Sequence, residues 1–220
     1  MMTNPHGKTG GSVGKLLVFE GVDAVGKSSL CQAVCDELRH QKINHKMLSF
    51  PGRDMGTIGE LIYRIHHRHA EEFSINTIDP LALQTLHIAA HIDLINSKIR
   101  AKILSGCWIV LDRFWWSTYV YGVSDGIRRE QVEALVRVEK NVWGDCLPDL
   151  VVLIDSKVPL RDDEQGNSEW HTKRNLYQSL AEKEKENYEI MRISNKINSL
   201  LKEQENTDRA KDIINALRLG

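Results

Sequence analysis

The hydrophobic pattern of the chain alternates between short apolar runs and longer segments with helical spacing. Runs that are short and continuously apolar indicate buried strands. Four segments have this character: residues 15–20, 45–50, 107–112 and 149–155. Between them, apolar residues recur every three or four positions. Strands that alternate with helices predict an α/β fold with a parallel sheet covered by helices on both faces.

The predicted helices have an apolar stripe, and some have recognisable ends. One begins at Asp79, an N-cap residue followed by Pro80 at the first helical position, where proline loses no hydrogen bond. The last begins at about Asp208 and ends near the end of the chain. The full set of predicted helices covers residues 27–41, 56–68, 79–104, 130–142, 175–191 and 208–219.

The remaining segments are predicted to form a fifth strand, a lid and an N-terminal tail around one domain. A fifth strand has only a weak signal, at residues 197–201. Residues 161–174 are polar and lack a core period, so we expect a short flexible lid there. Residues 1–14 are polar and rich in glycine, which predicts a flexible N-terminal tail. Since no repeat or linker divides the rest, residues 15–220 are expected to form one domain.

Composition narrows the class of protein. The 29 basic and 30 acidic residues leave a net charge of −1, so no basic surface points to a nucleic-acid polymer. No apolar run approaches the ~20 residues of a membrane span, and no signal core is visible. The four cysteines form no C-x-x-C pair, which favours reduced thiols. We therefore expect a cytoplasmic protein.

A phosphate-binding loop follows the first predicted strand. Gly21, Gly26, Lys27 and Ser28 complete the pattern G-x-x-x-x-G-K-S/T between that strand and a helix. In such a loop the backbone N–H groups surround phosphates, the lysine reaches the outer phosphates, and the hydroxyl can hold Mg²⁺. We expect ATP to contact the whole loop: Gly21, Val22, Asp23, Ala24, Val25, Gly26, Lys27, Ser28 and Ser29.

Charged residues follow two other predicted strands. Arg53 in "FPGR" and Arg113 in "LDRF" each lie where a strand ends, and the carboxyl ends of parallel strands meet at one edge of the sheet. A guanidinium binds phosphate with a matching two-pronged geometry. Asp112 stands at a Walker B position and, with Ser28, would hold Mg²⁺. The alternative is that both arginines are surface residues and Asp112 is a helix N-cap.

Taken together, these motifs resemble the thymidylate kinase family, which phosphorylates dTMP to dTDP with ATP. "FEGVDAVGKS" resembles the family's F-E-G-x-D-x-x-G-K-S loop, "FPGR" its F-P-x-R motif, and "DRFWWSTYVY" its D-R-Y/H-x-x-S-x-x-A-Y/F motif. "PDLVVLID" resembles the strand before the family's lid, and "LAEKEKENY" its returning helix. The similarity covers roughly residues 16–190 and implies a P-loop NTPase fold.

The resemblance implies a role for each matching residue. The implied catalytic residues are Lys27, Arg113, Asp23 and Asp112. The implied acceptor-binding residues are Phe50, Arg53, His87, His91, Arg113, Ser117, Thr118 and Tyr121. Within these sets, Arg53 and Arg113 would clamp the monophosphate, Tyr121 would pack under the deoxyribose, and Ser117 and Thr118 would line the base side. The family is homodimeric, so a homodimer is expected.

Departures from the family pattern lead to two further predictions. Ala24 occupies a position where one branch of the family has a catalytic arginine, so the cation is expected from the lid: Arg161, Lys173 or Arg174. His87 and His91 replace the phenylalanine and arginine of the family's F-x-x-x-R segment. We expect a weaker preference for dTMP and an activity that depends on pH near 6.5.

Alternative functions remain open at this point. A kinase for another nucleoside monophosphate or for a deoxynucleoside would use the same fold, although Arg53 favours a phosphorylated acceptor. A non-kinase nucleotide-binding ATPase would need only the loop. "NKIN" at 195–198 resembles the guanine-reading N-K-x-D tetrad of GTPases, but Asn198 replaces its aspartate.

Overall fold

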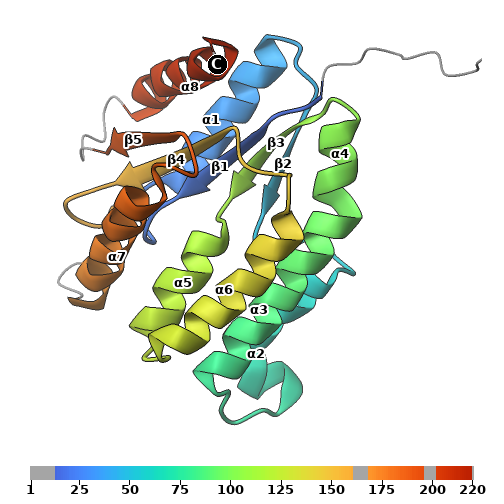
Figure 1. The fold of residues 1–220 in the computed structure, drawn as a ribbon, viewed down its shortest axis with the longest axis vertical. Helices are drawn as coiled ribbons and strands as arrows, with labels where there is room; N and C mark the ends of the chain where they lie inside the picture. The colour runs from blue at the N-terminus through green and yellow to red at the C-terminus, as the bar shows by residue number, and fades with distance from the viewer. Residues whose placement is uncertain (1–12, 161–167, 196–201, 220) are drawn as a thin grey trace, which may run out of the picture.

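A computed structural model describes residues 13–160, 168–195 and 202–219. Its sheet is entirely parallel, with the strand order β2-β3-β1-β4-β5 (Figure 1). The strands are β1 Leu16–Glu20, β2 His45–Ser49, β3 Trp108–Asp112, β4 Leu150–Asp155 and β5 Ile190–Ser194. The predicted five-stranded parallel sheet is confirmed.

Helices cover both faces of this sheet. In Figure 1, α1 and α8 lie side by side on one face, and the α3–α4 helix with α5 and α6 lies on the other. The helices are α1 Lys27–His40, α2 Ile58–Phe73, α3 Pro80–Leu94, the π-helix η1 Ile95–Ile99, α4 Arg100–Leu104, α5 Trp115–Ser124, α6 Arg129–Trp143, α7 Ser168–Glu184 and α8 Lys202–Leu219. None of the helices in these described stretches has the length and apolarity that crossing a bilayer requires.

The C-terminal third differs from the prediction. The helix expected over 175–191 ends at Glu184, and the fifth strand is Ile190–Ser194. This strand pairs with β4 at the edge of the sheet and is only half-buried, so it lacks the continuous apolar run of a central strand. The segment expected to form the fifth strand, 197–201, lies outside the described residues.

Two segments around the site differ from the prediction: helix α5 was not predicted, and the predicted lid extends into residues that belong to α7. In α5 every residue from Trp115 to Val120 is buried, so no polar face produces a helical period. Residues 168–174, expected in the lid, form the first turns of α7, where Trp170 is buried in the core. The rest of the expected lid, 161–167, and residues 1–12 of the expected tail lie outside the described residues.

The centre of the sheet fixes the position of the phosphate loop. Every residue of β1 is buried, and Phe19 is in register with Asp112 of the neighbouring strand. Ser49 at the end of β2 is also in register with Asp112. The three strands therefore end at one level, and the segments that follow them share one edge of the sheet.

Candidate active site

The loop between β1 and α1 is held by hydrogen bonds to its carbonyl groups. Asp23 O accepts from Trp170 Nε1 at 2.8 Å, Ala24 O from Leu160 N at 2.7 Å, and Val25 O from Asn195 Nδ2 at 2.7 Å. Since the N–H and C=O of one peptide unit point in opposite directions, three successive N–H groups face away from these anchors. This arrangement forms an anion-binding concavity at the start of α1.

Glycine is required at both ends of this loop. Gly21 has φ 143°, and a Cβ there would lie 2.4 Å from Ile154 O. Gly26 has φ 92°, and a Cβ would lie 2.9 Å from Asn195 Nδ2. Both positions therefore lie in the backbone region that favours glycine and leave no room for a side chain.

Lys27 is buried beneath the loop. Its Nζ donates to Gly21 O and Val22 O, both at 2.8 Å, and lies 3.9 Å from Asp23 Oδ1. Burial and the nearby Arg113 lower the pKa of Lys27 to about 8. An anion in the loop would give this ammonium a stronger partner than two carbonyl groups.

Ser28 and Asp112 are joined by a hydrogen bond at the same edge. Ser28 Oγ donates to Asp112 Oδ2 at 2.8 Å, although the two residues are 84 apart in the sequence. Asp112 is buried, and its Oδ1 has no hydrogen-bond partner among the described residues. The pair thus offers a hydroxyl and a carboxylate oxygen, the ligand types that Mg²⁺ prefers.

Arg113 lies at the centre of the site. It has φ 78°, and its guanidinium forms an ion pair with Asp23 of the phosphate loop. The guanidinium also donates to Ser117 Oγ at 3.1 Å and lies 5.1 Å from the centre of the Tyr121 ring. Tyr121 in turn donates to Asp23 Oδ2 at 2.5 Å. Four of the predicted residues therefore form one connected group.

Asp23 stays ionised in this group. Burial opposes its charge, but the charges of Arg113 and Lys27 outweigh burial and lower the pKa of Asp23 to about 2. The carboxylate holds Arg113 beside the phosphate loop, where a second anionic ligand would compete for the guanidinium.

Glu20, at the end of β1, supports the same group and was not predicted. It is completely buried and accepts from Phe114 N at 2.8 Å, Ser117 N at 3.0 Å and Ser117 Oγ at 2.9 Å. Burial raises the pKa of Glu20 from 4.5 to about 7, against the lowering effects of Arg113 and these hydrogen bonds. The sequence did contain a signal for this residue, because Glu20 is a charged residue at the end of an otherwise apolar strand.

This pKa predicts a specific pH dependence of stability. The folded protein keeps the Glu20 proton up to about pH 7, whereas the unfolded chain releases it near 4.5. The stabilisation from the protonated form is therefore present at low pH and is lost as the pH rises from 4.5 to 7. Across this window, the free energy of unfolding of wild type should fall by up to about 1.4 kcal/mol per pH unit relative to that of Glu20→Gln. Urea unfolding measures both free energies. Glu186→Gln, at an exposed position, is the control. Parallel pH profiles for wild type and Glu20→Gln would contradict this assignment.

Arg53 lies beside the site, on the loop after β2. Its guanidinium lies 4.6 Å from the centre of the Tyr63 ring. Burial and the charge of Arg53 lower the pKa of His67, and the charge of Asp23 raises it, so both charges act on the same imidazole.

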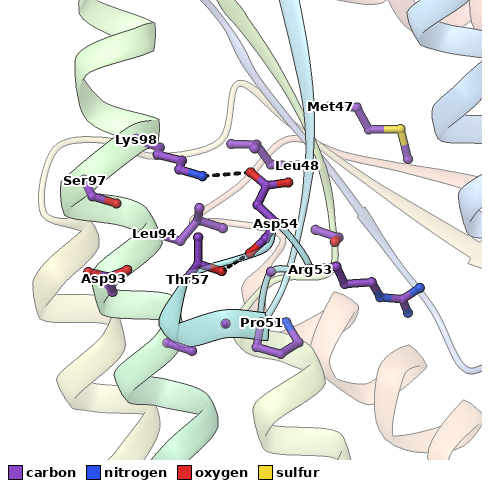
Figure 2. Close-up of a pocket in the computed structure, with 14 residues that line it drawn as sticks. Met47, Leu48, Pro51, Arg53, Asp54, Thr57, Asp93, Leu94, Ser97 and Lys98 are labelled. Carbon is purple, nitrogen blue, oxygen red and sulfur yellow. Dashed lines mark hydrogen bonds and ion pairs between the residues drawn. The ribbon is translucent and has the colours of Figure 1, made fainter. Parts of the chain in front are cut away.

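A cavity of about 150 Å³ lies behind the Arg53 loop and is separate from the phosphate loop (Figure 2). An ion pair between Lys98 Nζ and Asp54 Oδ2, at 2.7 Å, closes one side. Figure 2 shows the guanidinium of Arg53 turned away from this ion pair. The cavity contains no residue of the phosphate loop in its lining, so the group around Arg113 defines the candidate site.

The two histidines of the expected base pocket have different surroundings. His87 is mostly buried, and its Nε2 lies 2.9 Å from His66 Nδ1. Burial, with His91, His66 and Arg113 nearby, lowers the pKa of His87 to about 3. His87 is therefore neutral at pH 6.5. The expected dependence of activity on pH near 6.5 stays a prediction. The expected weaker preference for dTMP stays a prediction.

His91 is buried between Phe50 and α6. Its ring stacks on Phe50 with centroids 3.9 Å apart, and its Nδ1 lies 3.0 Å from Glu139 Oε2. Thr118 also contacts Glu139, at 3.4 Å, whereas Ser117 belongs to the Arg113 and Glu20 group. Glu139 was not predicted, although it lies on the buried stripe of α6 with Val136.

The expected lid cations lie in different places. Arg174 donates twice to Asp155, with both distances 2.6 Å. Lys173 pairs with Glu169 at 2.5 Å and lies 4.6 Å from the centre of the Tyr121 ring, so it reaches the candidate site. Arg161 lies outside the described residues.

The sheet order, the loop after β1, Lys27 and the Ser28–Asp112 pair define a P-loop NTPase fold. The family model for thymidylate kinase matches residues 19–208. The chain therefore belongs to the thymidylate kinase family and is a phosphotransferase enzyme.

Relatives agree with this assignment. The chain is 32% identical over 148 residues to "Thymidylate kinase" of Ruthia magnifica, which covers 67% of this chain and 68% of the relative. It is 30% identical over 159 residues to "Thymidylate kinase" of Burkholderia vietnamiensis, with 70% and 71% covered. The crystal structure of thymidylate kinase from Ehrlichia chaffeensis superposes with a TM-score of 0.71 at 18% identity, covering 92% and 99% of the two chains. This last likeness concerns the fold.

Proposed function

We propose that the enzyme transfers the γ-phosphoryl group of ATP to dTMP, giving dTDP and ADP. The observation that carries this proposal is the Arg113 group beside the phosphate loop, because it pairs a second phosphate-binding cation with the donor site. Phosphoryl transfer depends mainly on holding two anions in line and on neutralising the developing charge.

Each residue of the group has a proposed task. Lys27 exchanges its two carbonyl partners for oxygens of the outer ATP phosphates, while the loop N–H groups hold the rest of the phosphate chain. Arg113 exchanges part of its Asp23 contact for the acceptor phosphate, and Arg53 binds that phosphate from the other side. Tyr121 supports the acceptor sugar and keeps Asp23 in place.

The Ser28–Asp112 pair fits a bound Mg²⁺. Asp112 has a buried Oδ1 without a partner in the described part of the chain, and Ser28 presents a hydroxyl beside it. When bound, the ion would neutralise charge on the ATP phosphates. Asp112 would orient it directly or through a water molecule.

Lys173 is the proposed source of the cation that Ala24 does not supply. Its ammonium lies next to Tyr121, whose hydroxyl contacts Asp23, whereas Arg174 is held by Asp155. We therefore propose that Lys173 leaves Glu169 and reaches the transferred group when both nucleotides are bound.

Lys173→Ala should lower kcat on the order of tenfold or more, because a preorganised cation near the developing charge is lost. The KM for dTMP should change little. Lys183→Ala, at an exposed position of the same helix, is the matched control and should behave like wild type. Steady-state kinetics with saturating ATP measure both constants. A kcat of Lys173→Ala equal to that of the control would contradict the assignment.

A panel of acceptors tests the proposed function. ADP release should be stimulated by dTMP and less by other nucleoside monophosphates, and thymidine without its phosphate should give no stimulation. Stimulation by thymidine itself would favour a deoxynucleoside kinase. ADP release at one rate with every compound would favour an ATPase.

We also propose that the enzyme acts as a homodimer. Ile58 and Leu61, in the first turn of α2, and Met55, on the loop just before the helix, are exposed apolar side chains, and such a patch suits an interface. Sedimentation equilibrium would show twice the chain mass. Leu61→Glu should shift the enzyme toward the monomer.

A further inference from the structure

Trp170 is a side chain of α7 that reaches back to the phosphate loop. It is 2% exposed, and its Nε1 donates to Asp23 O at 2.8 Å, across 147 residues of sequence. A buried tryptophan usually has a partner for its N–H, but here the acceptor is a peptide group of the phosphate loop itself. The bond therefore joins the start of α7 directly to the loop that holds ATP in the proposed function.

The peptide unit between Asp23 and Ala24 has one polar group on each side of the loop. Its C=O accepts from the indole N–H, and its own N–H, which belongs to Ala24, faces the anion-binding concavity. Ala24 has φ 60°, a left-handed conformation that a residue with a Cβ keeps only when its surroundings hold it. A phosphate oxygen that accepted from the Ala24 N–H would polarise the peptide unit and make Asp23 O a stronger acceptor. The two hydrogen bonds are therefore expected to strengthen each other.

The same face of α7 contacts the group around Arg113. Lys173, one turn after the tryptophan, lies 4.6 Å from the centre of the Tyr121 ring. Tyr177, one turn further on, has its hydroxyl oxygen 2.9 Å from Ser117 Oγ, which also accepts from Arg113. Positions i, i+3 and i+7 share one face of a helix, so a bond that fixes the start of α7 also fixes these two contacts.

We propose that Trp170 is a positioning residue that couples the phosphate loop to the acceptor site. A phosphate in the loop strengthens the bond from Trp170 to Asp23 O, and α7 is thereby fixed where it meets the acceptor group. Asp23 completes this link, because its carbonyl pairs with Trp170 while its carboxylate pairs with Arg113. The proposal rests on the proposed function, since it takes ATP and a nucleoside monophosphate as the two ligands. Because coupling is reciprocal, each nucleotide should tighten the binding of the other by the same factor.

The test measures the affinity for dTMP by calorimetry, with and without Mg²⁺ and the non-hydrolysable ATP analogue AMP-PNP. In wild type, AMP-PNP should lower the Kd for dTMP about fivefold or more. Trp170→Phe keeps an aromatic ring but has no N–H to donate, so this factor should fall to about one, while the Kd for dTMP alone changes little. Trp108→Phe, the same substitution at the end of β3 that lies away from the site, should keep the wild-type factor. An equal factor in wild type and Trp170→Phe would overturn the proposal.

A second measurement does not depend on the variant folding. In ¹⁵N NMR of tryptophan-labelled wild type, the Trp170 indole signal is assigned through its NOE contacts with His171, whose ring centroid lies 5.1 Å from that of Trp170. AMP-PNP alone should move the indole proton downfield, because its hydrogen bond to Asp23 O becomes stronger. An unchanged signal or an upfield shift would overturn the proposal. Failure of wild type to bind dTMP at all would instead reject the proposed function, and the indole shift would still test the link between the loop and Trp170.

Discussion

Lys27→Ala is expected to lower the rate of phosphoryl transfer about a hundredfold or more. Lys27 is a buried cation beneath the phosphate loop, with its Nζ 2.8 Å from two loop carbonyl groups. Removing one such preorganised partner of the developing charge costs on the order of 3 kcal/mol. The loss should appear in the rate constant of phosphoryl transfer, measured by the formation of dTDP in single-turnover experiments.

The control for Lys27 is a lysine outside the site. Lys46, exposed on the edge strand β2, should tolerate alanine without loss of kcat. The binding of dTMP should survive in Lys27→Ala, because we assign the acceptor phosphate to Arg113 and Arg53. Near-normal turnover of Lys27→Ala would reject the assignment of the donor site.

Arg113→Ala is expected to have the second-largest effect, and it should change both kcat and the KM for dTMP. It removes a guanidinium that Asp23, Ser117 and Tyr121 hold in place. The acceptor phosphate loses a two-pronged partner, so the KM for dTMP should rise, and kcat should fall about a hundredfold. ATP affinity, measured by calorimetry without an acceptor, should change little.

Arg113→Lys separates charge from geometry. It keeps a cation but loses the planar fork, so its activity should lie between those of wild type and Arg113→Ala. Arg39→Ala, at an exposed ion pair at the far end of α1, is the neutral control. If Arg113→Ala lost ATP affinity and kept dTMP affinity, the donor and acceptor assignments would be reversed.

The sequence predicts the central part of the fold because its signals are local. The strand–loop–helix around Gly21 and Lys27 depends on glycine positions and on short apolar runs, which are visible without tertiary contacts. Arg53 and Arg113 follow from the same strands, since parallel strands end at one edge. Helix α5 and strand β5 lack such signals, because one is buried all round and the other is half-buried.

The partners of the buried carboxyl groups could not be predicted from the sequence. Glu139 contacts His91 across 48 residues, and Glu20 contacts Ser117 across 97. A charged residue on an apolar stripe marks each as unusual, but only tertiary packing identifies its partner. The low pKa of His87 could not be predicted for the same reason, because burial among other histidines cannot be read from helical spacing.

The most direct test of the proposed activity follows the γ-phosphoryl group itself. Wild type would be incubated with ATP labelled at the γ-phosphorus, Mg²⁺ and dTMP, and the products would be separated. The label should appear in dTDP, in an amount equal to the ADP formed, and little label should be released without dTMP. Label that accumulates in inorganic phosphate at the same rate with and without dTMP would contradict the account.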